Sequence, residues 1–279
     1  MALVASASFD ANAVIATEKL ADLSLVGDAD WAAAADRGIN ASMSLVASAT
    51  WASDVTTPSL ADISFIGTPQ TDEAITTTSL SVSLPSGSTT DDLVLLHVCA
   101  QDPTTDATST NFIAACAVQS SGDTSATSKL LYGLRQTVGA GPYTVSLGLN
   151  TNASVVCFVV RGADTSTPFD ALTHASHHLG EVATADLTAT IPAITTSTDK
   201  AMILQFSTIS HDSSAYTVNT SSGTNLYRLM SANTRTQCCF YELQATAGAY
   251  SEQTHTYTGN STGSPKKVSL VCAIKPAST

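Results

Sequence analysis

The chain has 279 residues, of which 43% are hydrophobic and only 12% are charged, and its formal net charge is −12. Globular chains typically carry about 25% charged residues, whereas Ser and Thr make up roughly a quarter of this one. The negative charge argues against a nucleic-acid partner, because phosphate backbones are bound by positive surfaces. Solubility is the simpler reason for the charge, and an acidic binding surface is the alternative.

The beginning of the chain lacks the features of a secretion signal. The first residues, Met1-Ala-Leu-Val, contain no basic residue, and Asp10 interrupts the first apolar stretch. No window approaches the roughly 18 uninterrupted apolar residues of a membrane span. We therefore expect synthesis in a cytoplasm and no insertion into a membrane.

The six cysteines form neither a CxxC pair nor a zinc pattern. Three of them lie in apolar runs, where a free thiol behaves as a small hydrophobic group. We expect buried, reduced cysteines, and a disulfide remains the alternative. The cysteines are Cys99, Cys116, Cys157, Cys238, Cys239 and Cys272.

The first region, residues 1–70, repeats itself. The stretch LVASASF at residues 3–9 returns as LVASATW at 45–51, and LADLSLVG at 20–27 returns as LADISFIG at 60–67. Alternating Ala and Ser predict strands with little side-chain bulk, which bury little apolar area by themselves. We expect this Ala/Ser-rich β-repeat region to need a partner and to serve assembly or anchoring.

The second region, residues 71–279, predicts many short strands separated by Gly, Pro, Asn and Ser turns. The first series is expected at residues 79–84, 93–100, 112–118, 129–135, 143–147 and 154–161. The second series is expected at residues 187–191, 201–209, 225–230, 237–243, 253–257 and 267–274. A loop over residues 162–186 is expected to join the two series.

The two series resemble each other in sequence. Residues 92–97 match 200–205, residues 131–140 match 240–249, and residues 155–160 match 269–274. The predicted fold is therefore all-β: a jelly-roll-like β-sandwich built from two similar antiparallel meanders. Its halves span about residues 71–161 and 186–279, and each is expected to supply one face of a shared core.

One histidine cluster, His174, His177 and His178, is the candidate metal site of the sequence. Three imidazoles in five residues suit a transition metal, but no cysteine is near and Glu181 is the closest carboxylate. A solvated loop or a subunit contact is the simpler interpretation. We expect neither a metal nor another cofactor.

Motifs of the common enzyme classes are missing from the sequence. There is no G-x-S-x-G, no P-loop and no G-x-G-x-x-G, and the S-x-x-K match from Ser264 to Lys267 contains Pro265 and precedes a strand. We therefore expect no catalytic residues. Six aromatic residues offer either stacking surfaces for sugars or, more commonly in strands, core contacts. They are Tyr132, Tyr143, Tyr227, Phe240, Tyr241 and Tyr257.

The order of the first strands, ending in VVCFVVRGADTSTPFD at residues 155–170, resembles β-sandwich minor tail and virion structural proteins of tailed bacteriophages. The upstream Ala/Ser repeats resemble segments of such proteins from phages of actinobacteria. The resemblance implies a non-enzymatic virion protein that assembles in the host cytoplasm and is multimeric. Its implied partners are other virion proteins, copies of itself and, in an adhesive role, host surface glycans.

Two other functions stay open beside a minor tail, fibre or tail-tip protein. One is a capsid decoration or head-spike protein that uses the same sandwich. The other is a carbohydrate-binding adhesin or a hydrolase of cell-wall glycans. In every case the segment at residues 155–160 is expected to end the first series, and residues 164–170 to enter the joining loop.

Overall fold

The long apolar runs of the sequence form strands that are covered on both faces. Every residue of strand β2 (Leu93–Ala100) is buried. Leu93 and Leu95 belong to one apolar cluster, whereas Val94 and Leu96 belong to another. Such continuous apolar runs are typical of strands with a layer on each side.

The computed structural model describes residues 60–101, 107–119, 127–177, 188–210, 217–220, 222–231, 235–258 and 266–278. All of them belong to the compact unit Val55–Thr279. Within this part of the chain, no helix is long and apolar enough to cross a membrane.

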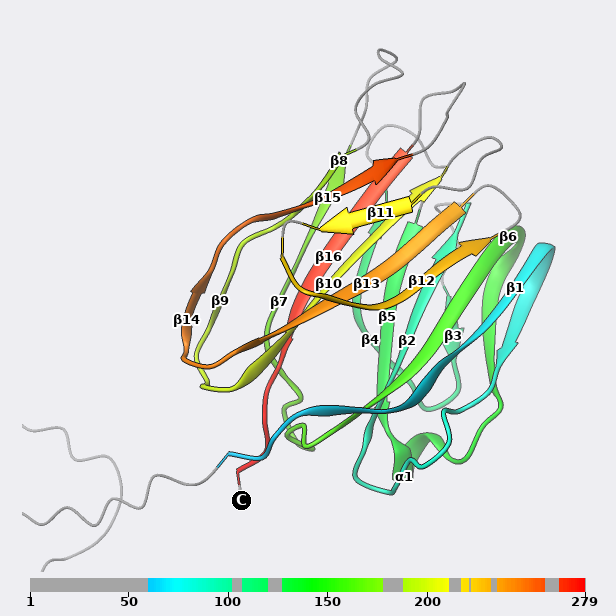
Figure 1. Ribbon diagram of the computed structural model, residues 1–279. Helices are drawn as coiled ribbons and strands as arrows, with labels where there is room; N and C mark the ends of the chain where they lie inside the picture. The colour runs from blue at the N-terminus through cyan, green and yellow to red at the C-terminus, as the bar shows by residue number, and fades with distance from the viewer. Residues whose placement is uncertain are drawn as a thin grey trace, which may run out of the picture. The chain divides into compact units, whose positions relative to one another are not determined.

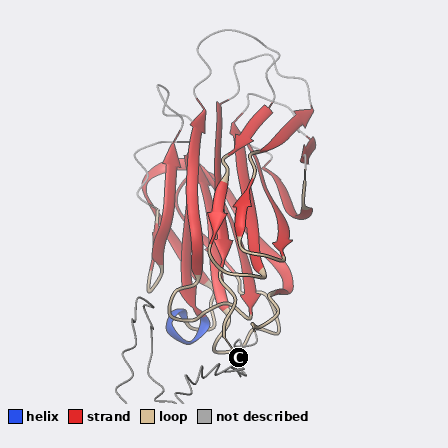
Figure 2. Cartoon of the chain, turned by 90° about the vertical axis from the view of Figure 1, so that its left-hand side faces the viewer, coloured by secondary structure: helices blue, strands red, loops and turns tan. Residues whose placement is uncertain are grey.

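Two antiparallel sheets carry the fold, and their strands run along similar directions in Figures 1 and 2. The first sheet has the order β1-β6-β2-β5-β4, and the short β3 also pairs with β6. Its other strands are β1 (Ser64–Val82), β3 (Thr108–Ser109), β4 (Ile113–Gln119), β5 (Thr127–Leu134) and β6 (Tyr143–Arg161). A single helical turn, α1 (Arg135–Val138), follows β5.

The second sheet has the order β12-β13-β10-β16-β7. Its strands are β7 (Phe169–His177), β10 (Ala201–Ser210), β12 (Thr224–Ser231), β13 (Arg235–Gln244) and β16 (Lys266–Ile274). The all-β sandwich predicted from the sequence is confirmed. The order within each sheet is not that of a simple meander, because β2 lies between β5 and β6, and β10 lies between β13 and β16.

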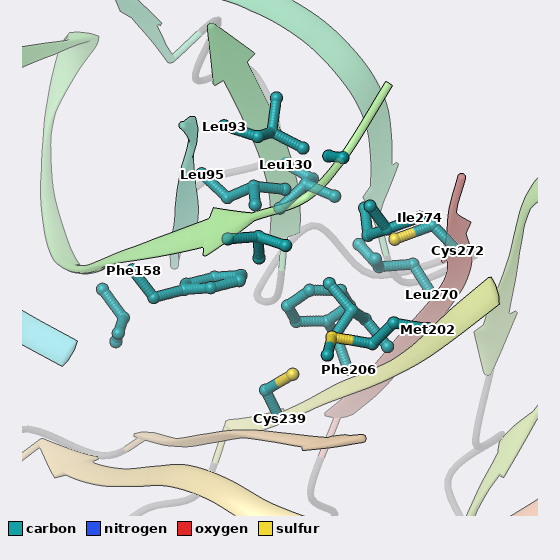
Figure 3. Packing of buried hydrophobic residues seen from close by; sticks show 14 of the residues in the cluster. Leu93, Leu95, Leu130, Phe158, Met202, Phe206, Cys239, Leu270, Cys272 and Ile274 are labelled. Atoms are coloured by element: carbon teal, nitrogen blue, oxygen red, sulfur yellow. The ribbon is translucent and has the colours of Figure 1, made fainter. Parts of the chain in front are cut away.

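The central core fills the space between these two sheets. Figure 3 shows the rings of Phe158 from β6 and Phe206 from β10 within it, and their centroids are 6.1 Å apart. Leu93, Leu95 and other side chains of the first sheet meet those of the second. Both phenylalanines are almost completely buried, and burying such a side chain contributes about 1.5–3 kcal/mol.

A further layer covers the outer face of the first sheet. The beginning of β6 pairs with the end of β1 and with β3, whereas the rest of β6 pairs with β1 and β2. Leu80 and Val145 from this outer part pack with Val94 and Val159 of the sheet. The two 19-residue strands thus serve two layers of the fold.

Two small sheets cover the outer face of the second large sheet. One has the order β11-β15-β8, and the other consists of β14 and β9. These strands are β8 (Thr188–Ile191), β9 (Ile194–Thr196), β11 (Thr217–Thr220), β14 (Gly248–Tyr250) and β15 (Gln253–Thr258). Ala189, Val218 and Tyr257 pack against Ile209 and Phe240 of the large sheet.

The strand orders of the two halves are equivalent. The order β1-β6-β2-β5-β4 in the first sheet corresponds to β7-β16-β10-β13-β12 in the second. The outer strands correspond as well, since β3, β6 and β1 are arranged like β11, β15 and β8. The internal sequence similarity therefore reflects a repeated arrangement of strands.

The register of the pairs corrects one residue match by a single position. Leu93 faces Val160 and Leu134, whereas Met202 faces Ile274 and Leu243. The structure therefore equates β2 with β10 through Leu93 and Met202, whereas the sequence match of residues 92–97 with 200–205 placed Leu93 on Ala201. A shift by one residue turns every side chain to the other face. Because both faces of these strands carry apolar residues, the sequence pattern could not show that this match was displaced by one position.

Equivalent residues of the two halves touch each other across the central core. With Leu93 equated to Met202, His97 corresponds to Phe206, and these two rings lie 4.9 Å apart. Cys99 corresponds to Thr208, and the Cys99 Sγ and Thr208 Oγ1 atoms are 2.9 Å apart. A pseudo-twofold axis therefore passes between β2 and β10.

Several strands were not expected from the sequence. The expected loop over residues 162–186 contains β7, which begins at Phe169. The strand expected at residues 79–84 begins at Ser64, and the strands expected at 143–147 and 154–161 form one continuous β6. Strands β3, β9, β11 and β14 have two to four residues and carry too little pattern to be recognised.

The second copy of the LAD repeat is part of the sandwich. Ala61 donates its backbone N–H to the Ala277 carbonyl, and Ile63 is buried in the central core. Residues 64–66 then pair with residues 159–161 of β6. Residues 1–59, including the first copy, lie outside the described residues.

Candidate functional site

The first polar cluster lies between the two large sheets. The Nδ1 atom of His97 is 2.6 Å from the Tyr227 hydroxyl, and its Nε2 atom is 2.7 Å from Ser128 Oγ. Burial lowers the pKa of His97 to about 3 and raises the pKa of Cys99 to about 12. The imidazole is therefore neutral and the thiol protonated at neutral pH, so neither is poised as an acid or a nucleophile.

Arg235 and Gln237 extend this cluster toward one end of β13. The Arg235 guanidinium donates to the Asn152 carbonyl, and Ser154 Oγ donates to Gln237 Oε1 at 2.8 Å. Both long side chains are about 1% exposed. Burial lowers the pKa of Arg235 to about 10, which leaves it charged at neutral pH.

The second polar cluster lies between the second large sheet and β15. Ser207 Oγ is 2.7 Å from His255 Nδ1 and 2.5 Å from the Tyr257 hydroxyl. The Nε2 atom of His255 is 3.2 Å from Gln205 Oε1. The Gln205 amide donates to the Tyr250 hydroxyl, which in turn donates to Glu242 at 2.8 Å.

A serine within hydrogen-bonding distance of a histidine is the usual arrangement of a hydroxyl nucleophile and its base. Here the third residue is the neutral Gln205, and both Ser207 and His255 are buried. Burial also lowers the pKa of His255 to about 3, well below the value near 7 that suits a base. This pair is therefore suited to holding β15 on the sheet.

A hollow opens beside the second cluster, between β11 and β12. It has a volume of about 490 Å³ and is lined by Val218, Asn219, Asn225, Arg228 and Phe240. Its volume falls within the roughly 300–1,000 Å³ of small-molecule sites. The Phe240 ring stands edge to face with His255 at 4.8 Å, so the hollow and the buried cluster share a wall.

The structure places two of the three candidate metal-binding histidines on β7. The backbone of His174 faces Leu270 of β16, and that of His177 faces Lys267. His178 lies outside the described residues, as do the side chains of the other two. Among the described residues, no group of three or more His, Cys, Asp or Glu residues is arranged to hold a metal ion.

The other sequence candidates have structural roles. All six cysteines are free and buried, as expected. Lys267 of the S-x-x-K match is buried in β16. Of the six aromatic candidates, Tyr132 and Tyr241 pack at the edge of the central core, and the other four are buried.

Sequence reasoning missed the lining of the hollow. Asn225 and Arg228 carry no motif, Asn219 begins an N-x-S/T sequence that is expected by chance in a chain so rich in Ser and Thr, and Phe240 had been singled out only as an aromatic residue. They converge through the pairing of β12 with β13 and the packing of β11 above it. No family model, curated protein or solved structure matches this chain.

Proposed function

We propose that this chain is a non-enzymatic structural protein of a tailed-phage virion, in a minor tail, fibre or tail-tip position. The observation that carries the proposal is the duplicated sandwich whose reactive side chains serve its own packing. His97, Ser207 and His255 are buried and bonded within the protein. The strand series that resembles virion proteins supports the same conclusion.

The segment before Leu60 is the part that we propose joins the chain to other virion proteins. The second LAD copy cannot be separated from the sandwich, because Ile63 is in the central core and residues 64–66 pair with β6. The useful boundary for an experiment is therefore Leu60 rather than the end of the Ala/Ser-rich region near residue 70.

The experiment compares virions assembled with the full chain, with a chain that starts at Leu60 and with a chain that starts at Pro69. Circular dichroism of the purified chains reports folding, and gold-labelled antibodies report incorporation and position. We expect the chain from Leu60 to fold but not to enter particles. The chain from Pro69 lacks Ile63 and is expected to unfold.

Two outcomes would count against the proposal. Absence of the full chain from particles would overturn the virion role, and normal incorporation of the chain from Leu60 would overturn the role of the preceding segment. Label on the head instead of the tail would favour a capsid decoration or head-spike protein.

A second candidate function, glycan binding, is favoured by the hollow between β11 and β12. The guanidinium of Arg228 and the carboxamide of Asn225 lie on one face of β12 beside this space, and such groups recognise hydroxyl-rich ligands. Hydrolysis of glycans normally requires a pair of carboxyl groups. The described lining of the hollow contains none, so binding is the better proposal of the two.

A further inference from the structure

A β-bulge places two polar side chains on the same face of β12. Asn225 is opposite Phe240, and Arg228 is opposite Cys238, while Tyr227 is opposite Cys239. In a regular strand, residues three apart point to opposite faces. The additional residue between Asn225 and Tyr227 brings Asn225 and Arg228 to the outer face, where the hollow lies.

The first half of the chain contains the same bulge without the polar side chains. In β4, Ala114 is opposite Leu131 and Ala117 is opposite Lys129, with the extra residue between Ala114 and Cys116. Through the equivalence of β5 with β13, Ala114 corresponds to Asn225, and Ala117 corresponds to Arg228. Both alanines are exposed, so the scaffold forms this bulge with alanine at either position.

Arg228 is an available cation in this hollow. It is exposed, and within the described part of the chain it forms no ion pair. Arginine stays charged and binds a carboxylate through two parallel hydrogen bonds. Bulges are common beside functional sites, where they redirect side chains.

The remaining lining suits a hydroxyl-rich molecule. The carboxamide of Asn225 offers two donors and an acceptor, and it lies on the same outer face of β12 as Arg228. Val218 and the edge of Phe240 provide an apolar wall. Phe240 is only 5% exposed, so the wall packs against a ligand edge and does not act as a broad stacking platform.

We propose that the hollow lined by Asn219, Asn225, Arg228 and Phe240 binds a carboxylate-bearing sugar residue, such as a uronic acid of a surface glycan. Arg228 pairs with the carboxylate, and Asn225 binds a ring hydroxyl. One guanidinium balances one carboxylate, whereas a phosphate carries up to two charges and would meet the field of a chain with net charge −12. The proposal rests on the glycan-binding candidate function.

The test is calorimetric titration of the full chain with a glucuronate-containing oligosaccharide at low salt. The comparison ligands are the same oligosaccharide with its carboxyl group reduced to the alcohol and the corresponding sugar phosphate. We expect binding of the acidic form at least ten times tighter than binding of the reduced form. Arg228→Ala is expected to weaken binding at least tenfold, and Asn225→Ala about two- to tenfold.

The internal repeat provides a matched control for charge. Arg228→Ala combined with Ala117→Arg keeps the net charge and moves the guanidinium to the equivalent position of the first half. This double variant is expected to bind as weakly as Arg228→Ala. Unchanged thermal unfolding of all variants shows that the loss is local, because alanine is already present at both equivalent positions.

Three results would overturn the inference: no binding of the acidic oligosaccharide, equal binding of its reduced form, or tighter binding of the sugar phosphate. Restored binding in the double variant would also overturn it, since charge alone would then explain the affinity. None of these results would contradict the virion proposal, because labelling of particles tests that proposal separately. Conversely, absence from particles would leave the binding result intact.

Discussion

The side chains of His97 and His255 serve the same purpose in the two polar clusters. Each joins hydroxyl or carboxamide groups of different strands in a space without solvent, at distances of 2.6–3.2 Å. Buried polar groups contribute to stability only when such partners are present. Each imidazole therefore links strands only while it remains neutral.

The stability of the protein should fall below pH 6.5. The pKa of both histidines is about 3 in the folded chain and about 6.5 when exposed. The unfolded chain therefore binds more protons as the pH falls from 6.5 toward 3, which lowers the free energy of unfolding. At pH 5 the loss is about 2 kcal/mol for each histidine, measurable by urea unfolding at pH 5 and 7.5.

His97→Gln is the control for this pH effect. Glutamine retains polar contacts but does not titrate, so about half of the difference between the two pH values should vanish. Equal free energies of unfolding at both pH values in the unchanged chain would contradict the neutral state of the two imidazoles.

The segment at residues 60–67 packs against the sandwich through two apolar side chains and ends at a glycine with positive φ. Ile63 is buried, and Phe65 packs edge to face on Tyr241 with centroids 4.8 Å apart. Gly67 follows with a φ of 66°. A side chain there would also approach the Ser86 carbonyl, because its Cβ would lie 2.7 Å from that oxygen.

Gly67→Ala should lower the free energy of unfolding by clearly more than Gly87→Ala. Both glycines have positive φ, but a Cβ at Gly87 meets only Ile66 Cγ2, at the ordinary contact distance of 3.6 Å. Gly87→Ala therefore measures the strained backbone alone, about 1 kcal/mol or somewhat more. Equal losses in chemical denaturation would show that the Ser86 carbonyl moves away without cost.

The two LAD copies differ at three positions of this segment. Ile63→Leu, Phe65→Leu and Ile66→Val give the second copy the sequence of the first, LADLSLVG. The chain should still fold and lose about 2–4 kcal/mol, from altered packing and the lost aromatic pair. Thermal unfolding measures the loss, and Ile63→Asp should be far more damaging because it buries a charge.

An unfolded chain after the triple replacement would contradict this expectation. It would mean that the second copy has become specific for its site and that the two copies are not interchangeable as strands.

The whole molecule depends on one core shared by its two halves. Phe158 from the first half packs on Phe206 from the second, and Phe206 also contacts its equivalent, His97. Neither large sheet can bury its inner face without the other. The halves should therefore unfold together.

Calorimetry should show a single unfolding transition for the sandwich. Phe158→Ala and Phe206→Ala should each lower this same transition, by about 3–5 kcal/mol in free energy. Ile113→Thr, at a side chain that is 59% exposed, should change it by less than about 0.5 kcal/mol. Two transitions, each sensitive to only one phenylalanine, would contradict the shared core.

Most of the fold class was accessible from the sequence. The runs around Leu93, Ala201 and Val268 predicted buried strands because β-branched and apolar residues recur between turn residues. The internal similarity predicted two halves around one core. Strands β7 and β11 escaped, because their pairing depends on distant strands and not on their own composition.

The candidate site was hardly accessible in this way. Arg228 and Asn225 belong to no recognisable motif in the sequence. The candidate metal site predicted from the sequence was the histidine cluster, which lies on another part of the chain. Their common face depends on a bulge, which exists only when β12 pairs with β13. Sequence spacing alone would have placed the two side chains on opposite faces.

The sequence by itself determined the all-β class, the duplication and the burial of free cysteines, because these follow from local pattern and composition. Only the tertiary structure decided the register of β2 against β10, the second use of β1 and β6 as an outer layer, and the hollow beside Phe240. Such features arise from pairing between distant strands, where a shift of one residue exchanges the two faces of a strand.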